Sequence, residues 1–170
     1  MNTFKTINPK NIQENTFQLM ATDWMLITAG NSKSYNTMTA SWGGLGHLWN
    51  KHIAICFIRP QRYTYEFVEK NEFFTLSFFH DKHREILNYL GKESGRNVNK
   101  MKVEGLTPII SENNSIYFEE AKLVLECKKL YFDDLESSHF IDKNLDKLYP
   151  TKDYHRMYFG EIVNCLQKVC

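Results

Sequence analysis

Six short apolar runs, each of strand length, constrain the fold of this chain more than any other feature. They are rich in β-branched and aromatic residues and are bounded by turn residues such as Gly30–Ser32 and Arg59–Pro60, a pattern typical of β-strands. The pair Gly43–Gly44 is predicted to end the second run. We therefore predict strands at Trp24–Ala29, Asn36–Trp42, His52–Ile58, Phe73–Phe79, Ala121–Tyr131 and His155–Leu166.

Two segments have helical periodicity. After Pro60, the side chains of Tyr63 and Phe67 share one helical face, and later Leu87 and Leu90 do so close to Gly91. The strands are not regularly separated by helices of roughly 10–15 residues, so a doubly wound parallel sheet is not expected. We expect a mainly β domain, a mostly antiparallel barrel with peripheral helices, because closure would protect the edges of such apolar strands.

The length and the charge balance narrow the range of functions. A chain of 170 residues falls within the ~100–200 residues of one domain, so we predict a single domain over 1–170 with a polar lead-in segment at 1–16. The 21 basic residues nearly balance the 20 acidic ones, giving a net charge of +1. This balance provides no general attraction to nucleic acid or to an anionic membrane surface.

The expected cellular location of the protein follows from three sequence patterns that we do not find: a signal peptide, a membrane span and a cysteine pair. The first residues have no signal-peptide pattern, and no stretch approaches the ~18 apolar residues of a membrane span. The four cysteines, Cys56, Cys127, Cys165 and Cys170, are scattered and form no CxxC pair. We therefore expect a cytoplasmic protein with reduced thiols.

The segment from Asn36 to Trp42 is the first candidate binding region. It places Asn36, Thr37, Thr39 and Ser41 along one strand, with an indole at its end. Small hydroxyl side chains allow a ligand to approach the backbone, and the indole offers a planar surface. The alternative interpretation is an ordinary threonine-rich strand with a buried tryptophan.

A second candidate region lies between a predicted strand and a predicted helix. Arg59 and Arg62 lie here together with an amide and hydroxyl groups, in the sequence Arg59-Pro-Gln-Arg-Tyr-Thr64. The free N–H groups at a helix N-terminus favour an anion. Solvated arginines that cap the helix are the alternative interpretation.

A third candidate region runs from Gly91 to Lys100. Ser94 and Gly95 permit a tight turn, and Arg96 and Lys100 supply positive charge, although the Walker pattern GxxxxGK[ST] is absent. A plain surface loop is the alternative. Two basic, hydroxyl-containing loops in a nearly neutral chain nevertheless indicate a phosphate ligand.

The sequence gives little support for a metal site or for a serine nucleophile. His80 and His83 form HxxH, but without an HExxH motif or a nearby cysteine pair we expect no metal site. Ser77 is not in a GxSxG elbow, so it is not predicted to be a nucleophile. His155 is either a ligand contact or simply the first residue of a strand. The catalytic residues remain unassigned.

Taken in order, these motifs resemble the flavin reductase family of the FMN-binding split barrel, and within it the flavoredoxin-like members. The resemblance extends from about Trp24 to Glu161. The segments that carry it are Asn36-Thr-Met-Thr-Ala-Ser-Trp-Gly43, Arg59-Pro-Gln-Arg-Tyr-Thr64, Leu76-Ser-Phe-Phe79, Ser94-Gly-Arg96 with Lys100, and Tyr154-His-Arg-Met-Tyr-Phe-Gly-Glu-Ile162.

This resemblance implies a six-stranded antiparallel split β-barrel, a homodimer, and FMN held near the subunit interface. It also implies roles for the candidate residues. The flavin would be lined by Asn36, Thr37, Met38, Thr39, Ala40, Ser41 and Trp42. Its phosphate and ribityl chain would be held by Arg62, Tyr63 and Thr64, with a backbone wall from Ser77, Phe78 and Phe79. An anion-binding group would comprise Ser94, Gly95, Arg96 and Lys100, and His155 would be a further contact.

The resemblance implies an oxidoreductase that passes electrons from NAD(P)H through FMN to a small or protein acceptor. The sequence has no GxGxxG motif, so a nicotinamide would bind only transiently, and the flavin would supply the hydride chemistry. Two alternatives remain open. One is a non-enzymatic electron carrier that serves a redox protein partner, and the other is a module that only binds flavin.

Overall fold

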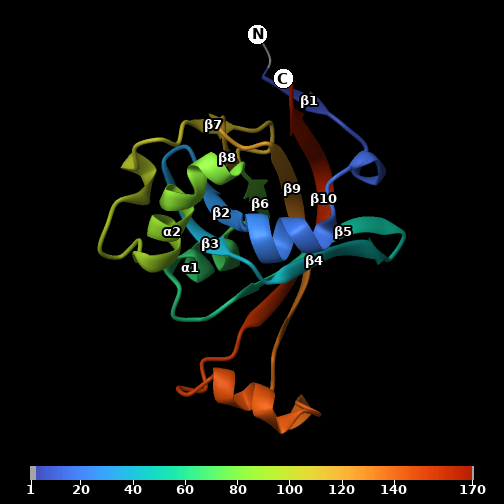
Figure 1. Cartoon of the computed structure of the whole chain (residues 1–170), viewed down its shortest axis with the longest axis vertical. Coiled ribbons are helices and arrows are strands. Elements are labelled where there is room, and N and C mark those ends of the chain that lie inside the picture. Colours follow the sequence, from blue (N-terminus) through green and yellow to red (C-terminus); the bar gives the residue numbers. More distant parts are fainter. Residues whose placement is uncertain (1–2, 170) are drawn as a thin grey trace.

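The computed structural model describes residues 3–169, and its main element is an antiparallel sheet of eight strands (Figure 1). Seven strands follow the order β3-β2-β6-β9-β10-β5-β4, and β1 pairs with β10. Since β3 and β4 end this path, the sheet is not closed by strand pairing. The bounds are β1 Phe4–Thr6, β2 Met25–Asn31, β3 Ser34–Ala40, β4 Gly43–Leu48, β5 Lys51–Ile58, β6 Phe73–Phe78, β9 Leu123–Asp134 and β10 Arg156–Lys168.

The mainly β, antiparallel fold with peripheral helices is confirmed, and each predicted run contains a strand. The strand number of six is too low. The segment at 1–16, to which no element was assigned, contributes β1, and a separate hairpin forms from β7 (Pro108–Ile110) and β8 (Ile116–Phe118).

The second predicted strand stops before Gly43–Gly44, since β3 ends at Ala40, but these two glycines begin a further strand, β4, that was not among the six predicted runs. A Cβ at Gly43 would lie 2.5 Å from the carbonyl oxygen of Ile55 on the paired strand β5. Glycine at this position therefore permits the close approach of the two strands. A turn with positive φ at Trp49 and Asn50 closes the β4–β5 hairpin.

Two helices cover the part of the sheet that ends at β3. Helix α1 (Tyr63–Lys70) buries Val68, and α2 (Arg84–Lys92) buries Leu87 and Leu90. Both helices contact β3. The core beneath them is built from fully buried side chains of the central strands, which include Ile27, Leu76, Phe78, Leu125 and Tyr158.

Strands β9 and β10 extend as a two-stranded ribbon, and the segment 135–155 between them projects away from the sheet (Figure 1). We call this segment the arm. Short 3₁₀ turns at Ser137–His139 and Lys143–Leu148 give it local order. Three of its aliphatic side chains are poorly covered: Ile141 is 96% exposed, Leu148 50% and Leu145 45%.

The cysteines that the structure describes, Cys56, Cys127 and Cys165, are buried free thiols, and Cys170 lies outside the described residues. Burial raises the pKa of the Cys165 thiol to about 12, so this side chain behaves as a small apolar group. Within residues 3–169, no helix has the length and apolar character needed to cross a bilayer.

Candidate functional site

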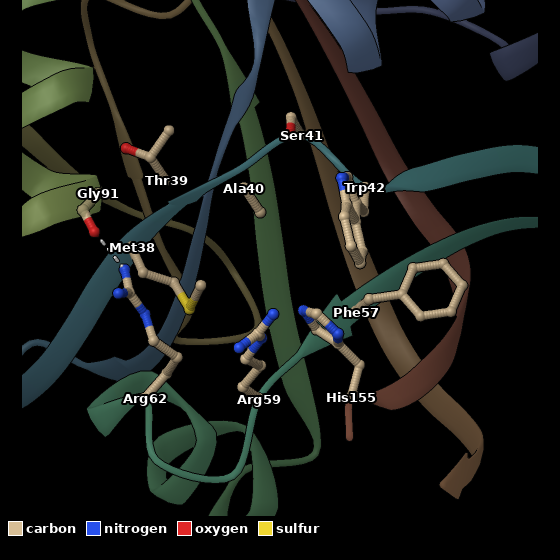
Figure 2. A pocket seen from close by; sticks show the side chains of 10 residues that line it. All are labelled: Met38, Thr39, Ala40, Ser41, Trp42, Phe57, Arg59, Arg62, Gly91 and His155. Carbon is tan, nitrogen blue, oxygen red and sulfur yellow. Dashed lines mark hydrogen bonds between the residues drawn. The ribbon is translucent and has the colours of Figure 1, made fainter. Parts of the chain in front are cut away.

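A trough of three adjoining pockets runs along β3. The first, about 290 Å³, is lined by Met38 to Trp42 and by Phe57, Arg59, Arg62, Gly91 and His155 (Figure 2). A second pocket of about 270 Å³ shares Thr39 to Ser41 with the first and reaches Trp24. A third of about 210 Å³ shares Met38 and Arg62 with the first and reaches Lys100. We call these three together the β3 trough.

The trough lies along β3 because that strand is an edge of the sheet. Only β2 pairs with β3, so the other side of the strand has backbone groups available for a ligand. Helix α2 flanks this side, and the Thr39 hydroxyl donates a 2.5 Å hydrogen bond to the carbonyl oxygen of Leu87. This bond fixes the helix against the strand and sets the width of the trough.

Arg62 places a partly buried positive charge where the first and third pockets meet. It is the N-cap residue of α1, and its guanidinium donates a 2.6 Å hydrogen bond to the carbonyl oxygen of Gly91 (Figure 2). Burial and the neighbouring Arg59 lower the pKa of Arg62. Within residues 3–169 it forms no ion pair with a carboxylate. An anionic ligand would supply the missing charge.

Lys100 is the second positive group of the third pocket. Its side chain is buried, and Nζ donates hydrogen bonds to the carbonyl oxygens of Thr37 at 2.9 Å and Leu90 at 2.7 Å. Burial, together with the nearby Arg62, lowers the pKa of Lys100 to about 8. An ammonium has three donors, so one N–H remains for a ligand.

The loop at Gly95 packs closely against the start of α1 and the start of β3. A Cβ at Gly95 would overlap the side-chain oxygen of Asn36 and lie 2.8 Å from the Tyr63 ring. The Asn36 amide in turn donates a 2.7 Å hydrogen bond to the Thr64 hydroxyl. These contacts join three segments that are distant in the sequence and form one polar pocket.

The opposite end of the trough is aromatic. The rings of Trp42 and His155 lie 4.8 Å apart, and Phe57 meets His155 edge-on at 6.4 Å (Figure 2). Nδ1 of His155 shares a 2.8 Å hydrogen bond with the Tyr149 hydroxyl. Burial and the nearby Arg59 lower the pKa of His155 to about 4, so the imidazole is neutral at pH 7.

Arg59 connects the arm to the trough. Its guanidinium donates a 3.0 Å hydrogen bond to Asp153 and a 3.1 Å hydrogen bond to the carbonyl oxygen of Leu148, and it lies over the Tyr149 ring at 5.0 Å. Because Arg59 is already paired with a carboxylate, Arg62 has the greater capacity for an external anion.

The structure brings most of the predicted site residues together. Those that line the trough are Asn36, Met38, Thr39, Ala40, Ser41, Trp42, Arg62, Tyr63, Thr64, Ser94, Gly95, Lys100 and His155. Thr37 does not line it, because its side chain is buried and its hydroxyl bonds to that of Thr28 at 2.8 Å.

The predicted wall of Ser77, Phe78 and Phe79 does not reach the trough. Strand β2 separates β6 from β3, and β6 is paired on both sides. The three side chains are at most 2% exposed. The backbone of Ser77 and Phe78 pairs with strands on both sides, Phe79 follows the end of β6, and all three side chains lie in the interior.

Arg96, predicted as part of the anion-binding group, also lies outside the lining of the trough. Its guanidinium bonds to Glu66 at 2.6 Å and to the carbonyl oxygen of Gln61 at 2.9 Å, and it lies over the Tyr63 ring at 4.9 Å. The intramolecular carboxylate therefore already neutralises this charge.

Sequence reasoning missed several lining residues. Arg59 belongs to a predicted candidate region but not to the predicted site residues, and Phe57 and Gly91 lie outside those residues as well. Phe57 belongs to an apolar strand, where no local signal separates a lining side chain from a core side chain. The contribution of Trp24 depends on the packing of α2 against β3, which the sequence does not reveal.

Comparison of the chain with models of protein families identifies one matching family. The model of the flavin reductase like domain matches residues 17–168. A search of curated proteins found no match to the chain.

Solved structures share the fold at low sequence identity. The flavoredoxin from Methanosarcina acetivorans has a TM-score of 0.68 at 20% identity, with 95% of this chain and 74% of that chain covered. An FMN-binding domain of a flavin reductases-like enzyme from Shewanella baltica has a TM-score of 0.70 at 13% identity, with 97% and 77% covered. The NADH:FAD oxidoreductase of Streptomyces globisporus, in complex with NAD and FAD fragments, has a TM-score of 0.65 at 14% identity, with 96% and 86% covered.

Proposed function

Because this chain belongs to the flavin reductase-like domain family, we propose that it binds FMN in the β3 trough and passes electrons from NAD(P)H to a small or protein acceptor. The observation that supports this proposal most is the uncompensated positive charge of Arg62. Its partly buried guanidinium faces two pockets of the trough and has no carboxylate partner within residues 3–169. A phosphate monoester is an anion of the size and charge that such a site accepts.

The residues of the third pocket fit the phosphate and ribityl end of FMN. Arg62 and Lys100 supply positive charge, and Ser94 adds a hydroxyl group. Helix α1 has no side-chain cap at its N-terminus, so its first N–H groups, at Tyr63 and Thr64, are available to an anion. The tight contact of Gly95 with Asn36 keeps the loop close to these groups.

The first pocket fits a planar ring system. Met38 to Ala40 provide the edge backbone of β3, Ser41 follows directly, and the half-exposed Trp42 provides a flat side. Bound FMN supplies the redox chemistry, because its isoalloxazine ring accepts a hydride from a nicotinamide. The chain's residues would bind and orient the ring. His155, neutral at pH 7, adds no charge beside it.

Anaerobic mixing of the FMN-loaded protein with NADH or NADPH tests the electron donor. We expect rapid loss of the flavin absorption near ~450 nm, followed by its recovery when an acceptor is added. Retention of FMN without bleaching by either nicotinamide would support the electron carrier instead. Failure to bind FMN at all would overturn both interpretations.

We further propose that the protein is a homodimer. The arm carries exposed apolar side chains at Ile141, Leu145 and Leu148, and Trp42 of the trough is 44% exposed. A second copy of the chain would cover such surface in a two-fold arrangement. The buried reduced thiols of the described residues fit our proposal of a cytoplasmic location.

A further inference from the structure

A second cavity, of about 620 Å³, lies where β1, the turn of the β7–β8 hairpin, β9 and β10 meet. It shares no lining residue with the β3 trough. In Figure 1 the labels β1 and β7 lie at the end of the molecule opposite the arm. The proposed flavin chemistry therefore gives this cavity no role.

The carboxylate of Glu126 lines this cavity although the residue is only 1% exposed. The Ser111 hydroxyl donates a hydrogen bond to one carboxylate oxygen, and the Asn113 amide donates a 3.2 Å hydrogen bond to the other. Within residues 3–169, Glu126 has no ion-pair partner. A carboxylate has about four acceptor positions, so two are free, and a buried carboxylate without a cation is costly.

An irregularity of β10 lies opposite this carboxylate. The register with β9 shifts between Ile162 and Asn164, so that Val163 is the extra residue of a β-bulge. Asn164 then pairs directly with Glu126, and both line the cavity. Bulges redirect side chains and are frequent beside binding sites. Here the bulge adds an amide group next to the buried carboxylate.

The remaining groups of the cavity favour an organic cation. The rings of Phe4 and Tyr117 line it and meet edge-on at 5.5 Å, and aromatic rings attract ammonium groups. Lys5 and Glu112 lie at its exposed rim, and in the part of the chain that the structure describes the Lys5 ammonium is not paired with Glu126. In the part of the chain that the structure describes, no group of three or more His, Cys, Asp or Glu side chains could hold a metal ion.

We propose that this cavity binds a small organic compound with a primary ammonium group. The ammonium donates hydrogen bonds to Glu126 and to the side-chain oxygen of Asn164. The apolar part of the compound lies against Tyr117 and Phe4. A neutral compound of the same shape would leave the carboxylate uncompensated and would bind poorly.

Titration of the full-length protein with n-butylammonium chloride tests this proposal, with backbone amide NMR as the readout. We expect saturable shifts at Ser111, Asn113, Glu126 and Asn164. n-Butanol, and potassium chloride at the same ionic strength, should produce no saturable shift. If neither the amine nor any control produces saturation at these residues, the cavity is not an amine site.

Two glutamate variants separate the buried carboxylate from general surface charge. Glu126→Gln keeps the shape of the side chain and should weaken binding at least ~10-fold, a factor that corresponds to about 1.4 kcal/mol. The matched control Glu112→Gln removes a carboxylate from the rim and should change binding less than ~2-fold, because exposed charges interact weakly. Equal effects of the two variants would overturn the proposal.

Glu126 also holds the hairpin turn through Ser111 and Asn113, so Glu126→Gln could fail to fold. The backbone amide NMR spectrum of ligand-free Glu126→Gln shows whether the variant is folded. If Glu126→Gln does not fold, Asn164→Ala tests the amine site instead, because this variant leaves both hydrogen bonds between Glu126 and the turn in place. We expect Asn164→Ala to weaken n-butylammonium binding about 3-fold or more, as loss of one hydrogen bond would. Unchanged binding would overturn the assignment of the ammonium group to a site shared by Glu126 and Asn164.

Discussion

The guanidinium of Arg62 donates a 2.6 Å hydrogen bond to the carbonyl oxygen of Gly91, and this bond joins the start of α1 to the last turn of α2. Gly91 lies near the end of α2, where carbonyl groups lack intrahelical partners. Arg62 satisfies one of these carbonyls while it faces two pockets of the trough. The hydrogen bond therefore holds the side chain in place before any anion arrives, which lowers the entropic cost of binding.

Arg62→Ala should weaken FMN binding by roughly 10- to 150-fold. The lost contact is a charge-assisted hydrogen bond, worth about 1.5–3 kcal/mol. Arg96→Ala is the matched control, because Arg96 is paired with Glu66 outside the trough lining. Its effect should be less than ~5-fold, since it changes mainly an exposed ion pair. Titration with FMN and with riboflavin, which lacks the phosphate, measures both effects. Equal losses for the two flavins in Arg62→Ala would contradict a phosphate contact.

FMN binding should weaken as the pH rises through about 8, the pKa of Lys100. Below this pH the ammonium attracts the phosphate, and above it the neutral amine does not, so proton loss and anion release are linked. Lys100→Met should bind FMN more weakly at pH 7 and show a flatter pH profile. Fluorescence titration between pH 7 and pH 9 measures this. The parent and Lys100→Met would have parallel profiles if Lys100 did not contact the anion.

His155 should make the folded protein less stable in mild acid. Its folded-state pKa of about 4 is below the ordinary histidine pKa of 6.5, so between these values the unfolded chain binds more protons. The free energy of unfolding therefore falls as the pH drops through this range. Because the ring is only partly buried, we expect a loss of about 1–2 kcal/mol. Urea unfolding at pH 7 and pH 4.5 measures it.

His155→Gln should reduce this pH dependence, whereas His139→Gln should not, because the His139 side chain is 75% exposed. An identical slope in the parent and in His155→Gln would assign the acid sensitivity to other groups. Both variants remove one imidazole from the region between β9 and β10, so they form a matched pair.

Sedimentation at micromolar concentration should give a dimer, twice the chain mass of 20.1 kDa. Ile141→Lys combined with Leu148→Lys places two charges on the exposed apolar surface of the arm and should shift the protein to monomer. Ile110→Lys is the control, because Ile110 is 55% exposed but lies on β7, outside the arm. A monomeric parent with FMN bound would contradict the proposed assembly.

Local sequence was sufficient to identify the secondary structure that surrounds the site. Apolar residues in short runs, such as Phe73–Phe79, predict strands because alternating or continuous burial is a property of neighbouring residues. The helix after Pro60 and the helix that ends near Gly91 follow from periodicity in the same way. Candidate segments such as Asn36–Trp42 also stood out, because several hydroxyl side chains follow one strand, although an ordinary threonine-rich strand was an equally open interpretation.

Tertiary structure decided which of these residues face the same space. Arg62 and Arg96 are both basic residues in hydroxyl-rich loops, yet Arg62 lines the trough and Arg96 pairs with Glu66. Likewise Ser77 lies in the interior, because β2 separates its strand from β3. Strand order and helix packing are set by contacts between residues far apart in the sequence. Local patterns therefore determined the elements and the candidate segments, and only the fold selected the side chains of the site.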